Sequence, residues 1–249
     1  MRGLGKLIVV QTKLFLREPP AFFFTLVFPV LMLVLYGAMF GNTPNPRSEH
    51  PGLGYVDISV PAITAIIIAT VALMSVPVAT AEEREKGILR RYRATPLAPA
   101  TYLAAHVAVY FGLALAGMLI LVAVGKVFYG LRFDGNWLSV LGGFTLSALA
   151  FFAVGYLLAS LAPTARVAQV VGQLAFFPMM FLSGATFPTE IMPAGVRRVA
   201  DLLPLTYVVR LLQGLWAGEA WGAHLTEATV LASMLVVGTL VSSRTFRWE

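Results

Sequence analysis

The feature that most constrains this chain is a series of long apolar segments without charge. A membrane-spanning helix needs about 20 mainly apolar residues, because lipid offers no partners to unpaired backbone groups. Five segments without Asp, Glu, Lys or Arg reach this length, and a sixth carries only Glu227 near its start. We therefore predict an all-α integral membrane protein with six transmembrane helices, spanning residues 21–41, 58–81, 102–125, 137–162, 167–187 and 225–243.

Composition agrees with a membrane protein and excludes several other classes. Only 12% of the 249 residues are charged, whereas 58% are hydrophobic, and soluble domains carry about twice that charged share. The chain has no cysteine, which excludes disulfides and thiolate metal sites, and its three histidines are far apart. For this reason no metal site is expected. No nucleic-acid partner is expected either, because the net charge of +6 fits membrane orientation and contact with anionic lipid.

The distribution of Lys and Arg predicts the orientation. With six spans and an inner N-terminus, 12 of the 18 basic residues lie on inner segments and 6 on outer ones. Cytoplasmic loops carry such an excess of positive residues. We therefore expect a multi-pass protein of the bacterial cytoplasmic membrane with both termini in the cytoplasm. The start of the chain is not expected to be a secretory signal, because Lys13 and Arg17 fall where the apolar core should lie.

Residues 1–20 are predicted to form an amphipathic helix that lies in the membrane interface. Lys6, Lys13 and Arg17 are spaced 7 and 4 residues apart, which places them on one helical face. Apolar residues occupy the other side, and Pro19 with Pro20 is expected to end the helix. Ordinary flanking charge that only sets the topology is the alternative interpretation.

Residues 188–222 are expected to form an outer re-entrant helical element before the last span. The apolar stretch 202–217 has 16 residues and contains Pro204, Arg210 and Gln213. It is short for a span. A seventh span would also put the N-terminus and the basic C-terminal tail on opposite sides of the membrane.

The loop 82–97 is the most informative polar segment. It holds eight charges in the twelve residues from Glu82 to Arg93. Glu82 and Lys86 are four residues apart in the favourable order, so the helix is expected to continue from the second span. Gly87 favours a bend, and Thr95-Pro96 stops the helix. Such a charged hairpin is suited to docking on a protein partner, although a loop that only sets topology is the alternative.

Three groups of motifs resemble the permeases of type-two ABC exporters. The resemblance covers nearly the whole chain in order. It comprises Leu16-Arg17-Glu18-Pro19 with Phe28-Pro29, then Glu82 to Gly87 with Leu89, Arg91 and Thr95-Pro96, and then Phe181-Leu182-Ser183-Gly184, Phe187-Pro188, Met192-Pro193 and Leu203-Pro204-Leu205-Thr206-Tyr207.

The resemblance implies a permease subunit that pairs with a second permease, as a homodimer or a heterodimer, and docks on a separate ABC ATPase subunit. The residues implied to couple to the ATPase are Glu82, Glu83, Glu85, Lys86, Gly87, Arg91, Thr95, Pro96 and Arg166. A possible substrate path between the two permeases would include Thr64, Thr70, Phe177, Met179, Met180 and Phe181. Reversing Glu83 and Glu85 to Lys is then expected to weaken docking and to leave membrane insertion intact.

The chain is not expected to be an enzyme. A P-loop requires GxxxxGK[ST], and neither Gly5-Lys6 nor Gly125-Lys126 is followed by Ser or Thr. ATP and Mg²⁺ would belong to the partner, and no cofactor is expected on this chain. A hydrophobic or amphiphilic substrate, drug or lipid-like, is expected, with a polysaccharide or lipid-linked glycan as the alternative. An ion-coupled secondary transporter is disfavoured, because the centres of the spans lack ionisable residues.

Overall fold

The computed structural model describes residues 2–44, 52–88, 99–187 and 192–245, and within these ranges every regular element is a helix. The predicted all-α fold is confirmed. The α-helices are α1 (Arg2–Leu16), α2 (Pro19–Phe22), α3 (Phe28–Phe40), α4 (Tyr55–Thr70), α5 (Val76–Glu85), α7 (Pro99–Tyr129), α8 (Trp137–Leu161), α9 (Ala165–Leu182), α10 (Ala194–Ala200), α11 (Pro204–Trp216) and α12 (Leu225–Thr245).

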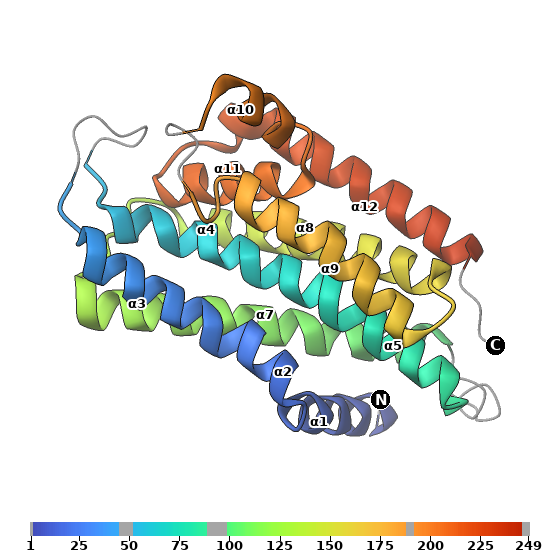
Figure 1. Ribbon diagram of the computed structural model, residues 1–249. Helices are drawn as coiled ribbons and strands as arrows, with labels where there is room; N and C mark the ends of the chain where they lie inside the picture. The colour runs from blue at the N-terminus through green and yellow to red at the C-terminus, as the bar shows by residue number, and fades with distance from the viewer. Residues whose placement is uncertain (1, 45–51, 89–98, 188–191, 246–249) are drawn as a thin grey trace.

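The six predicted spans are confirmed in the described residues. Helices long and apolar enough to cross a membrane cover Pro19–Phe40, Tyr55–Glu85, Tyr102–Tyr129, Trp137–Leu161, Ala165–Leu182 and Trp221–Thr245. Figure 1 shows the start of α1 and the end of α12 at the same end of the bundle, together with the end of α5 and the α8–α9 turn. We call this the α1 end and the opposite one the α10 end.

Most span boundaries shift from the prediction by a few residues. The second helix continues to Glu85, so the first charged residues of the predicted loop lie on a helix, as the Glu82–Lys86 spacing predicted. The fifth helix ends at Leu182 rather than at residue 187. Gly184, with φ +86°, follows two residues later in a left-handed conformation that favours glycine.

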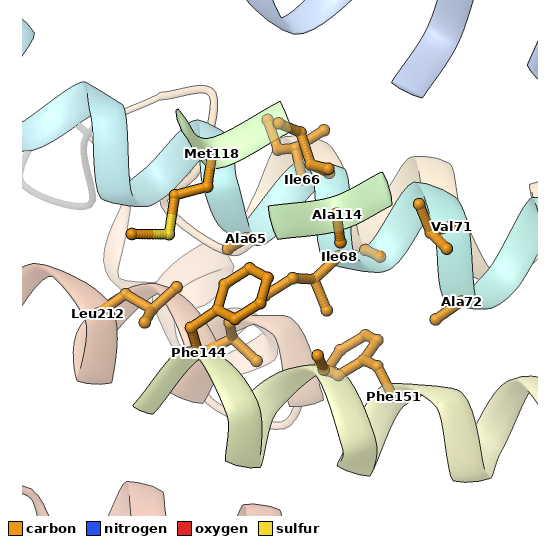
Figure 2. Close-up of a cluster of buried hydrophobic side chains, with 14 of the residues drawn as sticks. Ala65, Ile66, Ile68, Val71, Ala72, Ala114, Met118, Phe144, Phe151 and Leu212 are labelled. Carbon is orange, nitrogen blue, oxygen red and sulfur yellow. The ribbon is translucent and has the colours of Figure 1, made fainter. Parts of the chain in front are cut away.

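The second span forms the centre of the bundle. Its most apolar stretch is 78% buried, against 28%, 22% and 17% for the first, fifth and sixth spans. Figure 2 shows Ile68 of α4 beside Phe144 and Phe151 of α8, with Met118 of α7 and Leu212 of α11 in the same cluster. The outer spans instead expose large apolar side chains, which suits contact with lipid or with another membrane protein.

The second span is interrupted by a π-helical turn that packs against two glycines. The turn Val71–Ser75 precedes Pro77, which has no N–H to donate to the preceding turn. The carbonyl oxygens of Ala72 and Leu73 lie so close to Gly155 and Gly172 that a Cβ on either glycine would overlap with them. The backbones of α8 and α9 therefore approach the centre of the second span at its distorted turn.

Of the segment predicted to be re-entrant, the structure describes residues 192–222, and α10 and α11 lie toward the α10 end of the bundle (Figure 1). Most of α11 is buried, and it packs against α4, α8 and α12. Gln213 Nε2 donates to the Ile58 carbonyl oxygen at 3.2 Å, and Arg210 pairs with Asp201 at 2.5 Å on the exposed side. Arg210 and Gln213, which made this stretch a poor span, are therefore half-buried at the edge of the buried face of α11. The apolar residues of that face complete the core.

The N-terminal helix α1 lies against α7 at the α1 end. Phe15 is buried in the bundle, whereas Lys13 and Leu14 are exposed. Helix α1 ends at Leu16, before the two prolines, and Pro19 and Pro20 begin α2. The position of α1 in the membrane interface stays a prediction.

Candidate functional site

The last turn of α5 carries four consecutive charged residues that point in different directions. Successive residues of an α-helix are rotated by about 100°. Glu82 forms an ion pair of 2.5 Å with Lys86, and both side chains are exposed. Helix α5 ends at Glu85, and Gly87 follows with φ +66°, which fits the predicted bend, whereas the predicted stop at Thr95-Pro96 lies outside the described residues. The hydrogen bond of Lys86 to Glu82 raises the pKa of Lys86. This pair is therefore displayed on the outside of the bundle.

Arg84 and Glu85 connect α5 to the turn between α8 and α9. The Arg84 guanidinium donates to the carbonyl oxygens of Ala159, at 3.0 Å, and of Ala162, at the end of α8. Glu85 Oε1 accepts a 2.8 Å hydrogen bond from the backbone N–H of Ala165, at the start of α9. A cation at a helix C-terminus and an anion at a helix N-terminus are both electrostatically favourable. We call this arrangement the helix-end clamp.

Glu83 points to the other side, toward α1 and α7. Its carboxylate accepts hydrogen bonds from Gln11 Nε2, at 2.9 Å, and from the Tyr102 hydroxyl. His106 Nε2 lies 3.4 Å from Glu83 Oε1, and the His106 side chain is only 1% exposed. Glu83 thereby links the N-terminal helix, the second span and the third span.

The charged end of the second span is therefore partly structural and partly available to a partner. Glu83 and Glu85 are engaged within the chain, whereas Glu82 and Lys86 form an exposed pair. Arg166, in the first turn of α9, is also exposed. The clamp brings Arg166 to the same end of the bundle as that pair. Of the remaining predicted coupling residues, Arg91, Thr95 and Pro96 lie outside the described residues.

The predicted substrate-path residues fall into two groups. Thr64 and Thr70 are buried at the centre, and each hydroxyl donates to a carbonyl of its own helix at 2.8 Å. They do not lie on a surface of this subunit. On α9, Met180 is buried and Met179 half-buried, whereas Phe177 and Phe181 are exposed.

The two exposed phenylalanines belong to an apolar stripe along α9. Val170, Leu174, Phe177 and Phe181 are all exposed and recur at intervals of three or four residues, which places them on one helical face. This stripe is the part of the predicted path that a molecule outside the subunit can reach.

Several residues of this site are not predicted by any sequence pattern. Arg84 was part of the charged loop, but its role as a cap for α8 depends on where that helix ends. Gln11, Tyr102 and His106 come from two helices distant in sequence, and no motif connects them to Glu83. The one available signal was His106, a polar residue within an apolar run. Among the described residues no group of three His, Asp or Glu side chains is placed to hold a metal ion.

Six spanning helices and a charged segment fastened to a second interhelical turn define a multi-pass membrane protein. The chain belongs to the ABC-2 type transporter family, whose model matches residues 4–215. The expected family is thereby confirmed.

Individual relatives carry names of transport and resistance proteins. The probable multidrug ABC transporter permease YbhS of Escherichia coli K12 is 27% identical over 158 residues, which are 63% of this chain and 42% of that protein. The daunorubicin resistance ABC transporter permease protein DrrB1 of Streptomyces coeruleorubidus is 24% identical over 229 residues, or 88% of this chain and 77% of that protein. Nodulation protein J of Rhizobium leguminosarum bv. viciae is 30% identical over 115 residues, 45% of this chain and 44% of that protein.

Proposed function

We propose that this chain is the permease subunit of an ATP-driven exporter in a bacterial cytoplasmic membrane, with the α1 end in the cytoplasm. It would work with a separate ATPase subunit and a second permease, identical or similar. The observation that carries the proposal is the helix-end clamp. Arg84 and Glu85 hold the second span to the α8–α9 turn, so that Glu82, Lys86 and Arg166 are exposed at one end.

A docking surface of this kind suits energy coupling. A partner that moves the last turn of α5 also moves the turn between α8 and α9, because the clamp joins them. The second span is the most buried of the six, so its displacement is transmitted to the helices packed around it. ATP binding by the partner could thus rearrange the bundle without any nucleotide site on this chain.

We propose a hydrophobic or amphiphilic substrate, such as a drug or a lipid-like molecule. The exposed stripe on α9, with Phe177 and Phe181, supports an apolar route. The names of the multidrug and daunorubicin resistance relatives agree with it. A polysaccharide or lipid-linked glycan is the alternative, because the exposed Gln169 and the half-buried Gln173 could offer polar contacts on the same helix.

A charge swap tests the docking surface without breaking the ion pair. The double variant Glu82→Lys with Lys86→Glu keeps two opposite charges four residues apart but reverses their order. We expect it to insert and fold normally and to bind a co-expressed ATPase subunit at least about tenfold more weakly, which corresponds to about 1.4 kcal/mol. The matched control swaps Asp201 and Arg210, the pair at the α10 end, and should bind the ATPase normally.

Export itself is measured in proteoliposomes that contain the chain and the ATPase subunit. We expect uptake of a fluorescent amphiphile that requires ATP and is lost in the Glu82/Lys86 swap. ATP hydrolysis by the rigorously purified chain alone would contradict the proposal. So would a transport cycle that needs only an ion gradient.

A further inference from the structure

A cavity of about 440 Å³ lies at the α1 end, between α1, α5 and α7. This volume is within the range of pockets that bind drug-sized ligands. Its walls include the apolar residues Phe15, Val78 and Val109, and its polar groups come from all three helices. The cavity lies on the side of α5 that faces away from the helix-end clamp.

Acidic side chains outnumber basic ones in the lining of the cavity, three to two. Glu18, Glu82 and Glu83 all line it, and each ionised carboxylate can only accept. The two cations of the lining are Arg17 and Lys86, and Lys86 is paired with Glu82 at 2.5 Å. Glu83 is held in place by the neutral donors Gln11 and Tyr102. The excess of carboxylates favours a ligand that brings donors and positive charge.

His106 is an independent indication of a missing donor. It lines the cavity and is 1% exposed, and neither of its ring nitrogens makes a hydrogen bond. Nε2 faces Glu83 Oε1 at 3.4 Å, which leaves Nδ1 without a partner. A neutral imidazole has one accepting nitrogen, and a buried acceptor without a donor is unfavourable.

The carboxylates also influence one another. Partial burial first and the negative charge of Glu82 second raise the pKa of Glu18, while Lys86 lowers it. The negative charge of Glu82 therefore disfavours the ionised form of Glu18. A cation placed between them would relieve this repulsion.

We propose that the cavity binds a protonated primary amine carried on an apolar body, with the ammonium group between Glu18, Glu82 and His106 and the apolar part against Phe15 and Val109. The ammonium supplies three donors and a positive charge, as the acceptors require. Either an amine-bearing lipid headgroup or a free amphiphilic amine has this chemistry. The site does not depend on the proposed transport function, because binding needs no ATPase.

The test is native mass spectrometry of the full chain in detergent, titrated with three ligands that share one alkyl chain. Dodecylamine should bind at least about tenfold more tightly than dodecyl sulfate, since the ammonium donates charged hydrogen bonds to carboxylates whereas the sulfate brings only acceptors and a negative charge. Dodecyltrimethylammonium carries the charge without N–H donors and should be weaker than the amine. Equal binding of the sulfate would overturn the site, and equal binding of the trimethylammonium would overturn the requirement for N–H donors.

Variants locate the binding. Glu18→Gln combined with Glu82→Gln should weaken dodecylamine binding about tenfold. Glu18 is exposed on the rim, so Glu18→Gln alone is expected to fold normally and to give a smaller loss in the same direction. Asp134→Asn removes one negative charge from an exposed residue at the α10 end and should change nothing. An unchanged affinity in the double variant would refute the proposal.

Two bilayers distinguish the sources of the amine. The chain is placed in nanodiscs of phosphatidylcholine alone or of phosphatidylcholine with phosphatidylethanolamine. If the site holds a lipid headgroup, phosphatidylethanolamine will compete with dodecylamine and remain bound through purification. If it holds a free amine, the affinity for dodecylamine will be the same in both bilayers.

Discussion

The Glu85 carboxylate accepts a hydrogen bond of 2.8 Å from the backbone N–H of Ala165, so the last residue of α5 is joined to the first residue of α9. Eighty residues of sequence and two further spans separate the two partners. Because Arg84 caps α8 on the neighbouring side, three spans meet at one polar junction. A partner that docks there acts on the whole junction rather than on a loose loop.

Removing the Glu85 carboxylate should destabilise the junction. We expect Glu85→Ala to lower stability by about 1 kcal/mol, as the loss of a helix N-cap does. Glu85→Gln keeps an accepting oxygen and should lose less than half of that. The measurement is the melting temperature of the purified protein, followed by the fluorescence of its four tryptophans. Equal melting temperatures for all three proteins would show that this contact contributes no stability.

The double reversal of Glu83 and Glu85 to Lys, which the sequence alone suggests as a test of docking, would also disturb contacts within the chain. Both acids have partners within the chain, so two lysines would break the contacts with Gln11, Tyr102 and Ala165. A loss of export in that variant could then come from local unfolding as well as from weaker docking. The swap of Glu82 and Lys86 separates the two causes, because their ion pair is exposed and survives the exchange.

Gly155 should not tolerate a side chain. A Cβ at this position would overlap with the carbonyl oxygen of Ala72 in the π-helical turn. Overpacking of this kind costs about 1–3 kcal/mol, so Gly155→Ala should lower the melting temperature. Gly112→Ala is the matched control, because no atom of the described residues lies within 4 Å of its Cβ position. That variant should be neutral or more stable by up to about 1 kcal/mol. The same loss in both variants would refute the close approach.

Asp57 should be required for the structure of the α10 end. It is fully buried and accepts 2.8 Å hydrogen bonds from Asn42 Nδ2 and from the backbone N–H groups of Gly54 and Arg132. Asp57→Asn replaces one accepting oxygen with an amide donor that faces other donors. We expect a loss of about 1–3 kcal/mol, measured as a lower melting temperature, whereas Asp134→Asn, at an exposed residue, should have no effect.

The orientation of the bundle can be tested by cysteine labelling, because the native chain has no cysteine. Gly195→Cys lies on α10 and should react with a membrane-impermeant maleimide in intact cells. Arg166→Cys lies at the α1 end and should react only after permeabilisation. Both positions are exposed. The reverse labelling pattern would place the helix-end clamp outside the cell, where a cytoplasmic ATPase subunit could not dock on it.

The sequence by itself determined the number of spans and the class of the protein. The lack of water in a bilayer forces each crossing to be a long apolar helix, and this requirement is visible in uncharged segments such as 102–125. The even number of spans and the helical continuation past residue 81 followed from the same local rules. Boundaries shifted where local features such as the Ser183-Gly184 pair ended a helix early.

Tertiary structure decided which spans form the core. The second and fifth spans are both apolar enough to cross a membrane, yet one is 78% buried and the other 22%. Hydrophobicity does not distinguish lipid from protein as a neighbour, since lipid tails are as apolar as leucine side chains. For this reason Thr64, in the core, and Phe177, on the surface, could both be proposed for one substrate path.

Tertiary structure also decided what each charge at the end of α5 does. Composition shows a cluster of acids and bases, but the rotation between successive residues sends Glu83 toward α7 and Glu85 toward α9. Their partners, Tyr102 and Ala165, become neighbours only when the spans pack together. The charged segment could therefore be recognised from sequence, whereas its division into a structural clamp, an exposed pair and a cavity wall depends on contacts between distant residues.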